Sequence, residues 1–423
     1  MSDQIDFTHL PDLRDLLSGK SVAYRGILSI QTPVVYSGDH NENSLYMNGI
    51  DVLLCVIRHL YCQMPPDFSG DPKFSSPAVV SKIRGEYEEI NPLLRLAWSD
   101  LKRTDTCISA QNNVRCKIAK FLEQSPGVSG LSFMELVESP IMHRTLFSTE
   151  CFQLFDRMLL SQLISEDMAA APPGVHVPTN NEWDAEDAWA DPVASAKASL
   201  VTWDGQGDLA NFISDKFGLF TSQRVKRAYF WQGNRGAIIR VLYKAPLENP
   251  QTYSQLRMLK IEDKSLIIPD ETQPKSFLRE ASTGMYVLTT VVRLRMKPDE
   301  NDLLRRYGYE GQRLLEEVGW QFSRDDWRLG EPGRQYFLFY AYVEDQMPTA
   351  NLPEVLKEPR KATNRVAENY RWLENACGES SGDTWMDIPG DCPVNYREWI
   401  YCVTGASLWV EHAVYHRRIF EVT

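Results

Sequence analysis

Two groups of cysteine and histidine residues could carry out thiol chemistry. Cys55 and His59 are four residues apart, so on a helix they share one face, and the imidazole could take the proton of the thiol. Cys402, His412 and His416 form a second such group towards the C-terminal end. Both groups also have a structural interpretation. Cys55 is then a small buried apolar residue with His59 on the helix surface, and the second group belongs to a packed, aromatic-rich element.

Motifs for other kinds of catalysis are missing from the sequence. The eight cysteines contain no Cys-x-x-Cys pair. The chain also lacks His-Glu-x-x-His, a phosphate-binding loop, Gly-x-Ser-x-Gly and a dinucleotide-binding fingerprint. We therefore expect no metal site and no cofactor. Scattered cysteines without a dense pattern are typical of reduced thiols, which predicts a cytoplasmic or nuclear location.

The charge of the chain limits its partners. The net charge is −12 and the isoelectric point about 5.2, so we do not expect nucleic-acid binding, which needs a basic surface. Two short basic clusters, residues 224–227 and Arg305-Arg306, are typical of solvated surfaces. No stretch of some twenty apolar residues is present, so we expect no membrane association. The expected partner is another protein.

The elements that would position these residues begin with one helix. Apolar residues recur at helical spacing from Ile50 to Leu60, preceded by Asn43 and Ser44, whose side chains can cap a helix start. Met64-Pro65-Pro66 would end this helix. Similar spacing continues to Leu163, which predicts a helical lobe over residues 1–167.

An acidic connector is expected over residues 168–200. Its alanine, proline and acidic residues cannot build a core, so we expect it to be exposed. Trp183 and Trp189 within it are candidate anchors for a protein partner, because exposed tryptophans are enriched at interfaces. In the alternative interpretation, both indoles pack back onto their own domain.

Residues 201–345 have the composition of a β lobe. Three runs rich in β-branched and aromatic residues, 237–243, 285–294 and 336–343, predict strands. A helical insertion is predicted over residues 299–318. Residues 346–423 form a C-terminal extension. The chain is therefore predicted to have an α+β fold in which a helical lobe packs on an antiparallel β lobe.

Several of these segments resemble the ubiquitin-specific peptidases, which have a papain-like fold. Residues 43–48, Asn-Ser-Leu-Tyr-Met-Asn, resemble the cysteine box of that family, Asn-Thr-Cys-Tyr-Met-Asn. Five further segments follow in the order of the family's β lobe: 240–243, 266–269, 286–292, 319–322 and 336–340. The resemblance covers residues 25–345 and implies the fold of a cysteine peptidase.

The same resemblance implies that the catalytic groups are lost. The nucleophile's position holds Leu45, which has no nucleophilic atom. The oxyanion asparagine's position falls on His40, the catalytic histidine's on Tyr309, and the orienting acid's on Ser323. The chain has no histidine between His176 and His412 to act as a base.

The sequence thus predicts a pseudo-deubiquitinase, a non-catalytic protein that acts as a scaffold or complex subunit. Its partner would be a ubiquitin-like protein or another subunit of the complex. Two alternatives remain open. The chain could be a thiol hydrolase whose nucleophile is Cys55 or Cys402, or an unrelated α+β structural or assembly protein.

Overall fold

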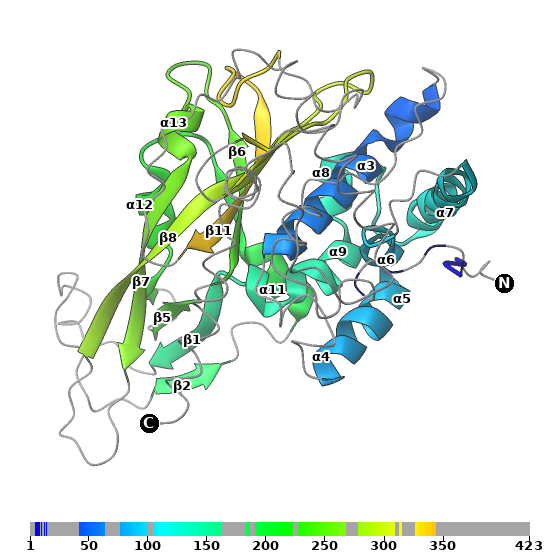
Figure 1. Cartoon of the computed structure of the whole chain (residues 1–423). Coiled ribbons are helices and arrows are strands. Elements are labelled where there is room, and N and C mark those ends of the chain that lie inside the picture. Colours follow the sequence, from blue (N-terminus) through cyan, green and yellow to red (C-terminus); the bar gives the residue numbers. More distant parts are fainter. Residues whose placement is uncertain are drawn as a thin grey trace, which may run out of the picture.

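The computed structural model describes residues 5–8, 10, 12, 14, 42–63, 77–99, 105–161, 183–186, 191–222, 227–234, 236–267, 278–308, 313–314 and 326–343. Within these residues the fold is α+β, with a group of helices packed against one face of a large sheet (Figure 1). The predicted fold class is confirmed at this level. The domain boundaries stay a prediction.

The central element of the helical lobe is α3 (Glu42–Gln63). Every residue from Met47 to Tyr61 is buried, as is typical of a helix enclosed on all sides. The predicted helix is confirmed, and it ends directly before Met64-Pro65-Pro66. It starts at Glu42, however, so Asn43 and Ser44 lie inside its first turn and do not precede it.

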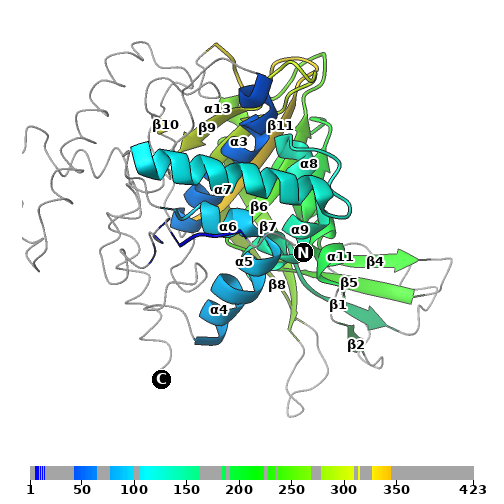
Figure 2. The same cartoon turned by 90° about the vertical axis from the view of Figure 1, so that its right-hand side faces the viewer.

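Shorter helices surround α3. They are α4 (Pro77–Ser81), the π-helix η2 (Lys82–Tyr87), α5 (Glu88–Ile90), α6 (Pro92–Leu96), α7 (Asp105–Gln124), α8 (Phe133–Val137), α9 (Pro140–Arg144), η3 (Leu146–Ser148) and η4 (Glu150–Phe152). Figure 2 shows α7 lying across α3, so that α3 lies between α7 and the sheet. Three further short helices, α11 (Pro192–Ala198), α12 (Leu209–Ser214) and α13 (Tyr253–Leu256), follow later in the chain, between the strands.

The large sheet holds all three predicted strands. Its order is β10-β9-β8-β11-β6-β3, and β7 also pairs with β8. The bounds are β3 (Leu200–Trp203), β6 (Ile238–Lys244), β7 (Met258–Ile267), β8 (Leu278–Arg293), β9 (Leu303–Tyr307), β10 (Arg313–Leu314) and β11 (Gln335–Val343). β11 lies between β6 and β8, and both pairings are antiparallel. Only β3 and β6 run parallel among the described strands, so the sheet is mixed and not purely antiparallel as predicted.

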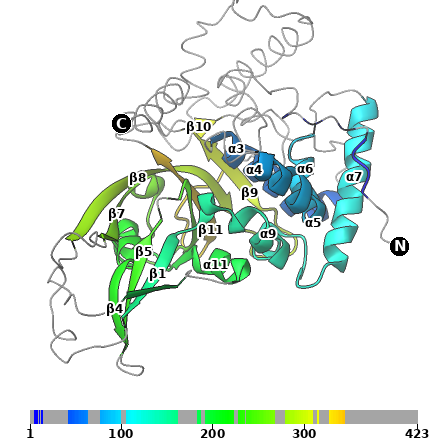
Figure 3. The ribbon, with the colours of Figure 1, turned by 90° about the horizontal axis from the view of Figure 1, so that it is seen from below.

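A second, four-stranded antiparallel sheet has the order β2-β1-β5-β4. Its strands are β1 (Phe155–Ser161), β2 (Trp183–Glu186), β4 (Gly218–Ser222) and β5 (Arg227–Gly233). This small sheet extends away from helices α3–α7 (Figure 3). The helical spacing predicted to continue to Leu163 is therefore wrong over residues 155–161, because β1 pairs there with both β2 and β5.

Two more predictions are corrected in the large sheet. The helical insertion predicted over residues 299–318 contains the strands β9 and β10. Arg305 and Arg306, predicted to lie on a solvated surface, are only 1% and 0% exposed. The guanidinium of Arg305 lies 4.1 Å from the ring centroid of Trp327, and its Nη2 donates a hydrogen bond to the Trp327 carbonyl. An aromatic residue distant in sequence thus covers this charge.

Candidate functional site

The first turn of α3 carries the position where the resemblance places a nucleophile. Leu45 lies in this turn, next to Tyr46, whose side chain is 42% exposed. The residues that follow, from Met47 onward, are buried between the helical lobe and the sheet. A thiol at position 45 would sit at a helix start, where the helix dipole favours a thiolate. Leucine offers no such chemistry.

The start of α3 is fixed to the sheet by a polar junction. The amide Nδ2 of Asn48 donates to the Asp302 carbonyl at 3.3 Å, and the Asp302 N–H donates back to Asn48 Oδ1 at 2.7 Å. The Asp302 carboxylate accepts from the backbone N–H groups of Phe133 at 3.0 Å and Arg295 at 2.9 Å. Asp302 therefore joins three parts of the fold: its backbone bonds α3, and its carboxylate bonds the N-terminus of α8 and the loop between β8 and β9.

Gly49 brings the backbone of α3 against the segment before α8. A Cβ atom at Gly49 would lie 2.1 Å from the Leu131 carbonyl oxygen and 2.5 Å from the Phe133 nitrogen. Both neighbours are backbone atoms, so no side-chain rotation could make room. The turn that follows Leu45 is thus held by close backbone contact as well as by the Asn48–Asp302 hydrogen bonds.

Burial raises the pKa of three titratable groups near this junction. Burial raises the pKa of Asp302 above its ordinary value despite its two backbone donors. Burial, followed by a hydrogen bond to Glu123, raises the pKa of Tyr46 to about 12, so its phenol stays protonated. Burial likewise raises the pKa of Asp51 to about 6, although Arg115 Nη1 lies 2.8 Å from its carboxylate.

Cys55 and His59 lie in the core of the protein. Both side chains are 0% exposed, so neither can meet a substrate from solvent. His59 Nε2 lies 3.2 Å from the carbonyl oxygen of Thr289 on β8, and it must donate, because a carbonyl only accepts. The prediction that Cys55 is a buried apolar residue is confirmed. The placement of His59 on the helix surface is wrong, because the sheet covers the side of α3 on which His59 lies.

Other predicted site residues lie outside the described part of the chain. These are His40, Trp189, Tyr309, Ser323, Cys402, His412 and His416. Trp183 begins β2 and pairs with Ser161 of β1, so it belongs to a strand of the small sheet. Its role as a partner anchor, like that of Trp189, stays a prediction.

The small sheet offers an exposed aromatic residue that the sequence did not single out. Phe220 on β4 is 39% exposed, whereas Phe230 on the neighbouring β5 is 3% exposed. Across the two strands Phe220 pairs with Tyr229, and Leu219 pairs with Phe230. Phe220 is therefore an exposed apolar side chain on the small sheet.

Two classes of site are not found in the described residues. No group of three or more His, Cys, Asp and Glu side chains in them could hold a metal ion. Within the same ranges, no helix is long and apolar enough to cross a membrane.

Asn48, Gly49 and Asp302 were missed by the sequence interpretation as residues that hold the site together. Asn48 is the last residue of the segment that resembles a cysteine box, and its partner Asp302 lies 254 residues further along the chain. A glycine inside an otherwise apolar helix was the one available signal, because such a glycine often marks close backbone approach.

Comparisons with known proteins give no family assignment. No family model and no curated protein match the sequence. Among solved structures, one similar chain comes from "Structure of the SAGA Ubp8/Sgf11/Sus1/Sgf73 DUB module", at 10% sequence identity. The match covers 75% of this chain and 69% of the other, with a TM-score of 0.26. A TM-score this low supports no conclusion about family or activity.

Proposed function

We propose that this chain is a catalytically inactive, ubiquitin-specific-peptidase-like protein that acts by binding protein partners, as a scaffold or as a complex subunit. The observation that carries the proposal is Leu45 in the first turn of α3, within a segment that resembles a cysteine box. The turn after it is fixed by Asn48, Gly49 and Asp302, so the helix start is held rigidly without a nucleophile.

The burial of Cys55 and His59 supports the same proposal. A displaced nucleophile at Cys55 would need solvent access and a base that can turn towards it. Cys55 is 0% exposed, and His59 Nε2 donates to a carbonyl of β8. The first of these conditions, access for a substrate from solvent, is not met at this pair.

Catalytic inactivity is tested with a fluorogenic ubiquitin conjugate. We expect no turnover by the unchanged protein, by Leu45→Cys or by the matched control Leu45→Ser. A thiol at position 45 still lacks a histidine to protonate the leaving amine, and each lost catalytic group lowers the rate by about 10²–10³-fold or more. We expect iodoacetamide to alkylate Leu45→Cys faster than the buried Cys55 and Cys151.

The outcome of this assay has a direct interpretation. Turnover by the unchanged protein would contradict the proposal and show that a nucleophile exists elsewhere. Turnover by Leu45→Cys, but not by Leu45→Ser, would show that a base and an oxyanion donor are still present around α3.

Ubiquitin binding is tested separately by isothermal titration calorimetry. We propose that β4 contributes to the partner surface through Phe220. Phe220→Ala should then weaken binding about fivefold or more, because buried aromatic anchors contribute roughly 1 kcal/mol or more at interfaces. Leu247→Ala is the matched control. Leu247 is 80% exposed and follows β6, a strand of the large sheet, so its removal should leave binding unchanged. No binding by the unchanged protein would exclude ubiquitin as the partner.

A further inference from the structure

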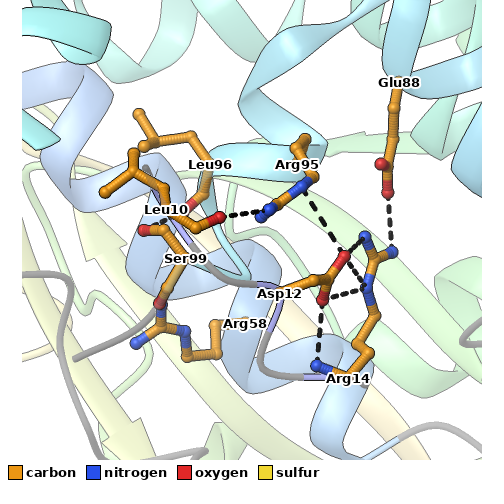
Figure 4. Close-up of polar contacts among 8 residues, drawn as sticks. All are labelled: Leu10, Asp12, Arg14, Arg58, Glu88, Arg95, Leu96 and Ser99. Carbon is orange, nitrogen blue, oxygen red and sulfur yellow. Dashed lines mark hydrogen bonds and ion pairs between the residues drawn. The ribbon is translucent and has the colours of Figure 1, made fainter. Parts of the chain in front are cut away.

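Leu10, Asp12 and Arg14, near the N-terminus, lie against α5, α6 and Ser99 of the helical lobe. Leu10 is 1% exposed and belongs to the hydrophobic core. Its carbonyl accepts a hydrogen bond from Arg95 Nη2 (Figure 4). Asp12 forms an isolated antiparallel bridge with Ser99, which follows α6. Main-chain pairing and a buried apolar anchor are both typical of peptide recognition.

The side chain of Arg14 fills a charged pocket at the end of this segment. It is 4% exposed, and its Nη1 lies 2.6 Å from the Glu88 carboxylate of α5. Asp12 accepts from Arg14 Nε at 3.0 Å and from Nη2 at 2.6 Å, which makes a two-pronged contact (Figure 4). The guanidinium also lies 5.6 Å from the ring centroid of Trp98. A planar guanidinium satisfies all three contacts at once, whereas an ammonium cannot.

The charges in this pocket balance. Arg14 and Arg95 face Asp12 and Glu88, and Arg95 Nε lies 3.6 Å from Asp12. Burial alone would raise the pKa of Asp12, but Arg14 and Arg95 together hold it below its ordinary value. Burial raises the pKa of Glu88 despite Arg14. Buried ion pairs contribute little to the net free energy of folding, because the cost of desolvating the charges offsets their attraction. The main effect of this arrangement is therefore specificity for an arginine side chain.

The receiving side of the groove is held by contacts that do not involve the N-terminal residues. Arg58 of α3 donates to the carbonyls of Ala97 at 2.6 Å and Ser99 at 3.2 Å. The ring of Trp98 packs on Tyr61 of α3 with a centroid separation of 5.9 Å. The groove is therefore positioned by α3, and the segment that occupies it is a separate part of the chain.

We infer that the surface formed by Glu88, Arg95, Trp98 and Ser99 is a peptide-binding groove for the pattern Leu-x-Asp-x-Arg. In this structure it is filled by the chain's own Leu10, Asp12 and Arg14. This inference goes beyond the proposed function and does not depend on it. A tethered segment has an effective concentration on the order of 1 mM, so it keeps the groove filled against weakly binding peptides. Weakening the tethered segment opens the groove to the same peptide in solution.

The test uses a fluorescein-labelled synthetic peptide with the sequence of residues 2–19 and the full-length protein. Fluorescence anisotropy should show that the peptide binds full-length Arg14→Ala about tenfold more tightly than the unchanged protein, whose own segment competes. A matched peptide with Arg14→Gln should bind Arg14→Ala about tenfold more weakly. Adding Glu88→Gln to the Arg14→Ala protein should weaken binding of the original peptide to a similar extent.

Equal binding of the original peptide to the unchanged protein and to Arg14→Ala would overturn the inference. Equal binding of the two peptides would overturn it as well. Circular dichroism first establishes that Arg14→Ala is folded. If it is not, full-length Arg14→Lys takes its place, because it keeps the charge and loses only the two-pronged contact. Unfolding of both variants would show that the segment is an obligatory part of the lobe, and the groove proposal would be wrong.

Discussion

At the scale of single residues, two buried titratable groups respond to pH in opposite directions. The pKa of Asp51 on α3 is raised to about 6, because the effect of burial outweighs the attraction of Arg115, so its neutral form persists to a higher pH. The pKa of His143 on α9 is lowered to about 4, because burial and then the charges of Arg240 and Lys197 disfavour its protonation, so it stays neutral to a lower pH. The two effects partly cancel in the whole protein, so single substitutions are needed to separate them.

Asp51→Asn tests the first group. Its pKa is about 6 in the folded state against an ordinary value of 3.8, so the folded state binds the proton more tightly between these values. The free energy of unfolding therefore falls as pH rises from about 4 to about 6. Urea unfolding at pH 4, 5, 6 and 7 should show this contribution removed in Asp51→Asn. It should persist in Asp215→Asn, whose side chain is exposed. An unchanged slope in Asp51→Asn would show that the carboxylate is ionised throughout.

His143→Gln tests the second group. The folded-state pKa of about 4 lies below the ordinary 6.5, so the unfolded state takes up the proton first. Stability should consequently fall as pH falls from about 6.5 to about 4, and His143→Gln should lose this dependence. The same urea series measures it, with stability at pH 7.5 as the reference. A variant that keeps the full dependence would exclude His143 as its source.

Burial of charge is the residue-scale property that the sequence did not reveal. Arg305 and Arg306 look like a surface cluster, and His59 like a polar residue on an exposed helix face. What buries them comes from far along the chain: Trp327 covers Arg305, and Thr289 of β8 accepts from His59. Local composition contains no information about such partners.

At the scale of elements, the contact between α3 and the segment before α8 is limited by space. Gly49→Ala should lower the free energy of unfolding by about 1–3 kcal/mol or prevent folding, because its Cβ would meet backbone atoms. Gly85→Ala is the matched control: it lies in η2 with no atom within 4 Å of the added carbon, and it should raise stability by about 0.5–1 kcal/mol. Thermal unfolding of the purified variants measures both. A stable Gly49→Ala would mean that α3 can shift away from Leu131.

Elements with strong local signals could be predicted from the sequence. The long apolar helix and the strands β6, β8 and β11 were predicted correctly, because each has a sustained pattern and a composition typical of its type. β1 and β9 were predicted as helices. Both are short runs in which apolar and charged residues mix without a clear period, and their strand conformation comes from pairing with β5 and β8. The exposed aromatic residue of β4 and the groove around Arg14 likewise depend on contacts between distant segments.

At the scale of the whole molecule, a single hydrophobic core connects the helices to the large sheet. Asp302 connects the same parts of the fold by hydrogen bonds. Asp302→Ala would leave the N–H groups of Phe133 and Arg295 without their acceptor, which should lower stability by about 2–4 kcal/mol. Far-ultraviolet circular dichroism and tryptophan fluorescence should shift together, since both report one cooperative unit. Asp299→Ala, an exposed carboxylate in the same loop, should change stability by less than about 0.5 kcal/mol. Separate transitions for the two probes would contradict the single core.

The order of strands in the small sheet also bears on how the chain folds during synthesis. β1 is made early, but one of its two neighbours, β5, follows only after β2, α11, β3, α12 and β4. The parallel partners β3 and β6 are likewise separated by the segment that contains β4 and β5. Until Gly233 has left the ribosome, one edge of β1 has no partner strand, and unpaired edges favour association between chains. Nascent chains that stall between Ser161 and Gly233 should therefore bind chaperones or aggregate, whereas chains stalled after Val343 should not.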